Sequence, residues 1–441
     1  MTRTRQIGLF WLLFSSSIFI LWGSSVERAS QGGMADFKAV FYGARCLMHH
    51  YDPYKESEFL RVYREDGGKF PSDPAIAPLF NRAIPVCINL PTSLFLIVPF
   101  AILPWGLAHL LWMALVACCL TLAAFLVWNL AGDSANGLSL LLICLVLSNS
   151  EILFASGNLA GIAVSLCIVS VWCFLKKRFV IIGIFCLAVS LVIKPHDAGL
   201  VWLYFLLVGG VHRKRALQTL ALTVAFALPA FLWVSYVAPH WMSELSNNIA
   251  STSAHGDLND PGLDSISKSG VGSVIDLQSA ISVFRDDPRI YNPVSFLICG
   301  ALLLVWLVRT LMLQLTQRRI WLALAAISAL SMLPVYHRQY DAKLLLLSIP
   351  ACVMLWAEGG VIGWLALLLN LTTAVFTGDI AQAIITTRSN YFHIGTSGIY
   401  EHILTALALR QVPLILLAMS IFYLWVYLRR AGPDIEAETA Q

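Results

Sequence analysis

A carboxylate stands at the start of an acidic and aromatic stretch that follows the first apolar run of the chain. The stretch opens with Asp36-Phe37-Lys38 and runs on to Asp52-Pro53-Tyr54. An aspartate at the mouth of an apolar bundle can accept a proton from a hydroxyl group as that hydroxyl attacks an electrophile. Asp36 is therefore the candidate catalytic base, and its position predicts chemistry at a membrane surface.

A second set of candidate residues is cationic and lies where later apolar runs end. These side chains could stabilise the charge that develops on a departing phosphate: Lys194, His196, His337 and Arg338. Arginine grips phosphate oxygens in a bidentate manner, whereas lysine acts as a point charge. Asp197 and Asp341 could pair with these cations, which would orient them but also compete with a phosphate. The alternative is that Lys194 and Arg338 only anchor helix ends at the interface.

The composition places these residues in a membrane protein. Hydrophobic residues make up 58% of the chain, charged residues 12%, and the mean hydropathy is +0.76. Because soluble domains carry about 25% charged residues, we expect an all-α, polytopic bundle of membrane helices. The ten cysteines lie mainly in apolar runs without metal-binding spacing, although Cys46 and Cys87 share the first loop and could pair.

The basic residues predict the orientation. Arg3 and Arg5 precede the first apolar run, which we interpret as a retained signal anchor with the N-terminus in the cytoplasm. Later basic clusters at 176–178, 212–215, 318–319 and 429–430 should also be cytoplasmic. All four clusters lie on the cytoplasmic side if Pro91 to Pro104 is a short re-entrant or interfacial element and Trp105 to Leu130 is the membrane span. This assignment gives about twelve spans with both termini cytoplasmic.

One integral plasma (inner) membrane domain should then cover residues 1–433, followed by a short cytoplasmic tail at 434–441. The external loops are expected at about 26–91, 239–292 and 378–401. The polar clusters that do not serve as cytoplasmic anchors then all lie on the external, or periplasmic, side. We therefore expect them to converge on one membrane face.

The first external loop should contain an amphipathic helix at the outer interface. From Phe37 the apolar positions follow helical spacing, and Lys38, Tyr42, Arg45 and His49 take the other side. The helix dipole would favour an ionised Asp36 near the N-terminal end. Two structural alternatives remain open: Asp36 could be an N-cap, and Asp52 before Pro53 could initiate a turn.

Several of these motifs resemble those of a known protein family. Asp36-Phe37, Phe41-Tyr42, Ala44-Arg45 and Asp52-Pro53-Tyr54 resemble the signature of glycosyltransferase family 87, and the similarity continues at Asn89-Leu90-Pro91, Gly157-Asn158, Lys194-Pro195, and His337 with Tyr340-Asp341. The resemblance implies a GT-C fold and a polyprenyl-phosphate sugar donor, typically carrying mannose. It also implies that Asp36 is the base and that His337 contacts the donor phosphate.

The substrate-binding residues expected from these motifs are Tyr42, Arg45, Asp52, Tyr54, Asn158, Tyr340 and Asp341. The chain departs from the family pattern at one of them. The family usually shows Gly-Gln followed two residues later by Asn, whereas here Gly157 precedes Asn158, and Ala160 stands at the later position. A sugar-binding role and a structural break between spans are both open for this element.

The combined prediction is a membrane glycosyltransferase of the cell envelope. Asp36 would deprotonate a hydroxyl of a lipid or glycan acceptor, and the sugar, a hexose with mannose favoured, would be transferred with inversion at C1. The prenyl tail would stay among membrane lipids. Nucleic acid is not expected as a partner. The alternatives are a transporter or flippase for a lipid-linked or anionic substrate, and a polymerase or ligase that joins lipid-linked glycans.

No D-x-D motif stands out in the sequence, and a lipid-phosphate donor carries a single phosphate. Protein cations can take the part that a metal plays with nucleotide sugars. We therefore expect catalysis without a metal or another cofactor. The spans carry little central charge, with Glu151 as the main exception, and no internal repeat is visible, which argues against a transporter.

Overall fold

The structure is a computed structural model that describes residues 3–30, 33–72, 77–132, 136–262, 274–381, 383–384 and 398–429. Within these ranges the chain is helical, and the only β interaction is an isolated bridge between Val274 and Arg338. The all-α prediction is confirmed for this part of the chain. The tail 434–441 and parts of the loops 239–292 and 378–401 lie outside the described residues.

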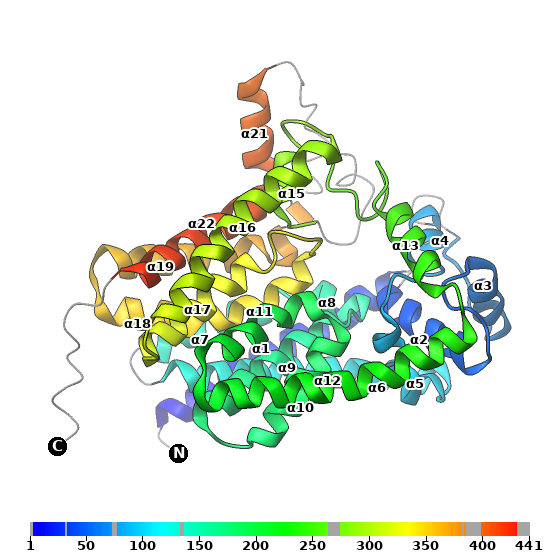
Figure 1. Ribbon diagram of the computed structural model, residues 1–441, viewed down its shortest axis with the longest axis horizontal. Coiled ribbons are helices and arrows are strands. Elements are labelled where there is room, and N and C mark those ends of the chain that lie inside the picture. The colour runs from blue at the N-terminus through cyan, green and yellow to red at the C-terminus, as the bar shows by residue number, and fades with distance from the viewer. Residues whose placement is uncertain are drawn as a thin grey trace.

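The helices follow one another with short connections (Figure 1). In the first half they are α1 (Arg3–Ala29), α2 (Ala35–Met48), α3 (Glu56–Glu65), α4 (Ala77–Ala83), α5 (Pro91–Ala101), α6 (Trp105–Ala131), α7 (Asn136–Leu147), α8 (Glu151–Ser156), α9 (Ala160–Lys176) and α10 (Val180–Ile193). In the second half they are α11 (Pro195–Val208), α12 (Gly210–Val237), α13 (Trp241–Thr252), α15 (Leu277–Ile281), α16 (Pro288–Met312), α17 (Gln317–Leu330), the 3₁₀-helix η1 (Gln339–Ser348), α18 (Ile349–Glu358), α19 (Gly360–Phe376), α21 (Ile399–Leu409) and α22 (Gln411–Leu428).

Six segments of the described chain are long and apolar enough to cross a membrane. They are Arg5–Ala29, Trp105–Ala131, Gly210–Val237, Pro288–Met312, Gln339–Glu358 and Gln411–Leu428. Further apolar helices are shorter, with α9, α10, α11 and α19 among them. The chain is therefore a membrane protein, while the count of about twelve spans stays a prediction.

The region from Pro91 to Trp105 shows how proline divides the chain. The helix α5 has 11 residues with Pro99 inside it, and α6 begins directly after Pro104. Eleven helical residues extend only about 16 Å, roughly half of a hydrocarbon core. The short element is thus separate from the 27-residue α6, whose bounds agree closely with the predicted span.

The centre of the bundle is α9, which packs against α6, α10 and η1. Small residues such as Gly161 and Ala163 let neighbouring helices approach it closely. Two sharp corners need glycine. Gly209 and Gly359 have φ values of 84° and 78° with ψ near −167°, a conformation that only glycine adopts readily.

The first loop folds back on itself. The helix α2 packs against α5, and α3 packs on α2 with its buried residues Phe59, Val62 and Tyr63. As a result Tyr42, expected on the polar side of an amphipathic helix, is only 3% exposed. The expected helix is present, but α3 covers part of the side that local spacing predicted to be polar.

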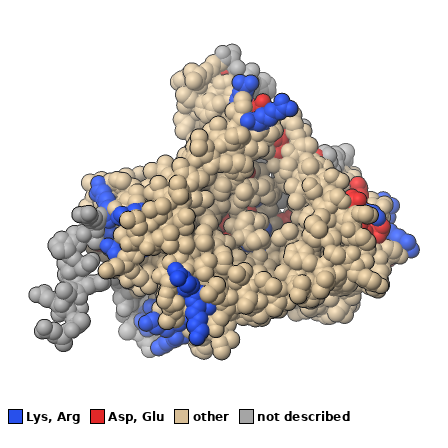
Figure 2. All heavy atoms as spheres, viewed as in Figure 1, with Lys and Arg blue, Asp and Glu red and all other residues tan. Residues whose placement is uncertain are grey.

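Figure 1 shows that α1 begins, α22 ends, and α12 and α17 begin at one end of the molecule. Lys and Arg side chains gather over that end in the space-filling view (Figure 2). The helices α2, α3 and α13 lie toward the other end. This separation agrees with a basic, cytoplasmic end, although the side of the membrane that each end faces stays a prediction.

Candidate active site

Asp36 lies in the first turn of α2, one residue inside the helix. The N-cap position belongs to Met34, whose φ of 59° is left-handed, and no side chain caps this helix. The N-cap alternative for Asp36 is therefore wrong. Its carboxylate instead accepts a hydrogen bond of 2.8 Å at Oδ2 from the side-chain amide of Asn158.

Asn158 is itself held in one orientation. Its Oδ1 accepts a hydrogen bond of 2.8 Å from the backbone N–H of Ala160, at the start of α9, so that Nδ2 is directed to Asp36. The preceding Gly157 has a φ of 64°, and its carbonyl accepts a bond of 2.8 Å from the Trp112 indole. A Cβ at Gly157 would lie 2.8 Å from the Met34 side chain, so glycine allows α8 to approach the start of α2. The Gly157-Asn158 element thus breaks the helix and also contacts the candidate base.

Lys194 connects the cationic elements. It lies between α10 and α11, donates a hydrogen bond to Asp341 Oδ1, and lies 3.8 Å from Asp197 Oδ2. Burial would lower the pKa of Lys194, but the charges of Asp197 and Asp341 outweigh it and raise that pKa. The expected pairing of the cations with these two carboxylates is therefore present.

The two histidines approach Asp197 from different elements. Asp197 Oδ1 lies 3.3 Å from His337 Nε2 and 3.7 Å from His196 Nε2, and the two imidazole rings are 4.8 Å apart. Burial would lower the pKa of His337, yet its contact with Asp197 and the charge of Asp341 raise it. His337 is fully buried, whereas the His196 side chain is 36% exposed.

Arg338 caps the 3₁₀-helix η1 and contacts the long loop at 239–292. Its backbone N–H donates a bond of 2.8 Å to Asp341, and its guanidinium donates to the Leu258 carbonyl at 2.6 Å and to the Tyr336 hydroxyl. Burial would lower the pKa of Arg338, but Tyr336, Tyr340 and, more weakly, Asp36 raise it. The guanidinium of Arg338 is thus within the electrostatic reach of the Asp36 carboxylate.

These contacts bring the candidate base and the four candidate cations into one region. Asp36 and Asn158 come from the α2 and α9 side, Lys194 and His196 from α11, and His337 and Arg338 from the segment before η1. Figure 2 shows a hollow between the α15–α16 arm and the α13 side of the molecule, with charged atoms visible at its floor. An acceptor hydroxyl and an anionic donor could meet in such an arrangement.

Arg45 lies apart from this region and joins elements of the first loop. Its guanidinium donates to the Ala101 carbonyl at 3.0 Å and to the Leu103 carbonyl at 2.9 Å, and it pairs with Asp66. Tyr42, also expected at the substrate, packs in an aromatic cluster with Tyr63 and Trp105. Both placements favour roles in packing, and substrate contact stays a prediction for these two residues.

Asp52 and Tyr54 also hold the loop together. Asp52 Oδ1 accepts a hydrogen bond of 2.9 Å from the Tyr54 N–H. This bond closes the turn that was predicted as the structural alternative for Asp52 before Pro53. The Tyr54 hydroxyl donates to the Asn89 carbonyl at 2.9 Å, and Asn248 in α13 donates to the Tyr54 carbonyl at 3.0 Å.

Cys46 and Cys87 are both buried free thiols.

Tyr340 and Asp341 are buried beside Lys194. The Lys194 ammonium lies 5.2 Å from the centre of the Tyr340 ring, and Asp341 binds Lys194 and the Arg338 backbone with its two oxygens. Asp341 therefore positions cations. Sequence reasoning missed Leu258 and Trp112, because their contacts with Arg338 and Gly157 join distant segments. It also missed Tyr336, whose hydroxyl contacts Arg338 two residues further along the chain.

A second buried charged group surrounds Glu151. Lys343 donates a bond of 3.1 Å to the Asn149 carbonyl, and Asp379 accepts a bond of 2.6 Å from the Ile152 N–H. Glu151 and Asp379 interact with each other and with Lys343. Lys343 is 2% exposed and therefore does not snorkel to the surface, as a lysine near a span end could.

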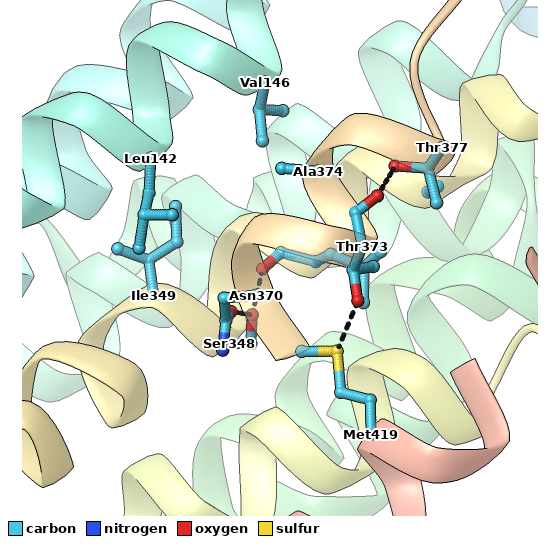
Figure 3. A pocket seen from close by; sticks show the side chains of 11 residues that line it. Leu142, Val146, Ser348, Ile349, Asn370, Thr373, Ala374, Thr377 and Met419 are labelled. Carbon is cyan, nitrogen blue, oxygen red and sulfur yellow. Dashed lines mark hydrogen bonds between the residues drawn. The ribbon is translucent and has the colours of Figure 1, made fainter. Parts of the chain in front are cut away.

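One small cavity can be separated from the site (Figure 3). It has a volume of about 10 Å³ and lies between α7, η1, α18, α19 and α22. Ser348 donates to Asn370 at 2.7 Å and Thr373 to Met419 at 3.5 Å, so its polar groups pair with one another. A space of this size holds at most one water molecule, and we assign it to packing.

Comparison with known proteins indicates a sugar-transfer function for the chain. The model of glycosyltransferase family 87 matches residues 88–272, which confirms the resemblance over that range. The match includes Asn158, Lys194 and His196, whereas Asp36 and His337 lie outside it. No curated protein and no solved structure matches the chain. The family match and the apolar helices together indicate a membrane glycosyltransferase.

Proposed function

We propose that this membrane glycosyltransferase, recognised as family 87, moves a hexose, with mannose favoured, from a polyprenyl-phosphate donor to an acceptor hydroxyl. The observation that carries the proposal is the shared location of one partly exposed carboxylate and several fixed cations. Asp36 acts electrostatically on Arg338, and Arg338 is joined through Asp341 to Lys194. A base and a leaving-group site are the two parts that displacement at a sugar carbon requires.

In the proposed reaction the acceptor oxygen attacks C1 of the sugar from the side opposite the phosphate. Asp36 takes the hydroxyl proton, the new C1–O bond forms, and the bond between C1 and the phosphate oxygen breaks. Polyprenyl phosphate leaves with the bonding electron pair, and the configuration at C1 inverts. Asn158 keeps Oδ2 of Asp36 occupied at 2.8 Å, so that Oδ1 is the oxygen that faces the acceptor.

The cations are the proposed site for the departing phosphate. Lys194 and Arg338 carry the charge, and His196 and His337 add N–H donors beside them. Their pairing with Asp197 and Asp341 holds them in place before the donor arrives, which reduces the reorganisation needed during the reaction. A donor with one phosphate therefore meets protein cations, and we propose that no metal ion is required.

The location at a membrane surface follows from the donor's tail. Removing a prenyl chain from lipid costs about 0.8 kcal/mol for each CH₂ group, so the donor stays in the bilayer while its sugar reacts. We propose that the site faces the external, or periplasmic, side and that both termini are cytoplasmic. The family match favours transfer over transport, and no observation supports the transporter alternative.

The test uses the purified full-length protein with radiolabelled polyprenyl-phosphate mannose and a membrane lipid extract, with glucose and arabinose donors run in parallel. Asp36→Asn should lower the transfer rate by about 10²- to 10⁴-fold, because the acceptor proton then has no base. The matched control is Asp287→Asn, since Asp287 caps α16 and asparagine is an equally good cap. Equal transfer by Asp36→Asn and wild type would remove Asp36 from the mechanism, and absence of transfer from every donor would refute the proposed donor class.

A further inference from the structure

We propose that His196, Asp197 and His337 form a binding site for a divalent transition-metal ion of the zinc type, and that the bound ion inhibits the enzyme. The binding half of the proposal rests on geometry alone. The inhibition half rests on the proposed function, because it assumes that the two imidazoles serve the donor phosphate.

The distances from Asp197 to the two histidine nitrogens match the spacing of zinc ligands. Asp197 Oδ1 lies 3.3 Å from His337 Nε2 and 3.7 Å from His196 Nε2, and all three atoms lie within 4.8 Å of one another. Two ligand atoms that are each about 2.1 Å from a tetrahedral zinc ion lie about 3.4 Å apart. Two imidazole nitrogens and one carboxylate oxygen also form a common zinc ligand set.

The buried ligand atoms contact their charged neighbours at ion-pair distances. Asp197 is 1% exposed and His337 0% exposed, and neither Asp197 oxygen nor His337 Nε2 makes a well-directed hydrogen bond within the described part of the chain. Buried polar atoms are normally bonded, so this convergence indicates a missing partner. Lys194 lies on the Oδ2 side of Asp197 at 3.8 Å, which leaves Oδ1 directed at the histidines.

The orientation of His337 supports this assignment. Its Nδ1 lies 2.8 Å from the Val335 carbonyl oxygen, and a carbonyl only accepts, so Nδ1 carries the proton of that bond. The proton on Nε2, which faces Asp197 when the ring is charged, must leave before a metal ion binds, and Nε2 then presents its lone pair. Metal-binding histidines typically have this arrangement, in which a backbone carbonyl holds the other ring nitrogen.

The site also has an entrance. The His196 side chain is 36% exposed, whereas its two partners are buried, so an ion can arrive from the His196 side. Three protein ligands leave a fourth position open to water or a phosphate oxygen. An ion bound here would take both imidazole nitrogens away from the donor, and inhibition should follow.

The binding experiment uses full-length protein stripped of metal, dialysed against zinc at mildly alkaline pH, with the bound zinc counted per chain. Wild type should bind one zinc at this site, and His196→Gln should weaken that binding by about tenfold or more. The matched control is His255→Gln, because His255 belongs to a separate group with Asp260 and Asp286. Failure of wild type to bind zinc, or loss of binding only in His255→Gln, would overturn the site.

The same preparations are then assayed for sugar transfer, each against its own zinc-free rate. Zinc should reduce the rate of wild type and reduce that of His196→Gln much less, while EDTA should leave wild type active. Zinc binding without any effect on the rate would overturn the inhibition. Loss of activity in EDTA that zinc restores would overturn both inhibition and metal-independent transfer while supporting the site.

Discussion

Asn158 shows how a residue that departs from a family pattern can still contact the site. Local sequence left a sugar-binding role and a helix break equally open, and the structure shows the break together with a bond to Asp36. Spacing along the chain cannot reveal this bond, because 122 positions separate the two residues. Asp36 itself could be identified beforehand, since an acidic residue after an apolar run is visible in the sequence.

At this residue we predict that Asn158→Ala lowers kcat by about 10- to 100-fold with little change in the KM for the donor. A hydrogen bond to a charged group contributes about 1.5–3 kcal/mol, and its loss frees the carboxylate to rotate. Steady-state kinetics on purified protein measures the effect, and Asn247→Ala, an exposed change in α13, serves as the control. A rise in KM at constant kcat would instead place Asn158 on the substrate.

Lys194 allows stability and catalysis to be separated. Lys194→Met should lower the free energy of unfolding by about 3–5 kcal/mol, because the nearly buried Asp341 and Asp197 would lose their shared cation. Adding Asp341→Asn should recover much of that stability but no activity, since the phosphate site would still lack the ammonium group. Thermal unfolding and transfer assays on both variants measure the two effects. Recovery of activity in the double variant would show that Lys194 is only structural.

The helices were predicted best where their boundaries depend on neighbouring residues in the sequence. Proline and hydropathy indicated the division between α5 and α6, and helical spacing indicated α2. Burial of Tyr42 could not be foreseen, because it depends on how α3 folds back. The contact between Arg338 and Leu258 was equally hidden, since it joins two segments 80 residues apart.

A substitution of Arg45 tests what holds the first loop against α5. Arg45→Met should lower the melting temperature by several degrees, because two backbone carbonyls and Asp66 would lose their donor at the junction of α2 with α5. The KM for the donor should change little in protein that remains folded. Arg61→Met is the control, since Arg61 is exposed, pairs with the exposed Glu65 four residues away and lies over the Tyr51 ring within the first loop. Unchanged stability with a raised KM would restore the predicted substrate contact.

For the whole molecule, the prediction that the polar clusters share one membrane face can be tested by finding which side of the membrane each loop faces. The helices α2, α3 and α13 lie toward the end of the molecule opposite the basic helix ends (Figures 1 and 2). We predict that Ser253→Cys reacts with a membrane-impermeant thiol reagent on intact cells, and that Lys177→Cys reacts only after the cells are permeabilised. Wild-type protein gives the background from its own cysteines. The opposite labelling pattern would place the site in the cytoplasm.

The ten-residue 3₁₀-helix η1 has a mechanical consequence for the molecule as a whole. Such runs rarely exceed four residues, and ten residues wound this way extend about 20 Å, against about 15 Å as an α-helix. Every residue of η1 is buried, so the element cannot relax by fraying. Because Arg338 precedes its first residue, rewinding this segment would displace the arginine by up to about 5 Å while Asp36, held on α2, stays in place. The pitch of one buried helix therefore influences how far Arg338 stands from Asp36.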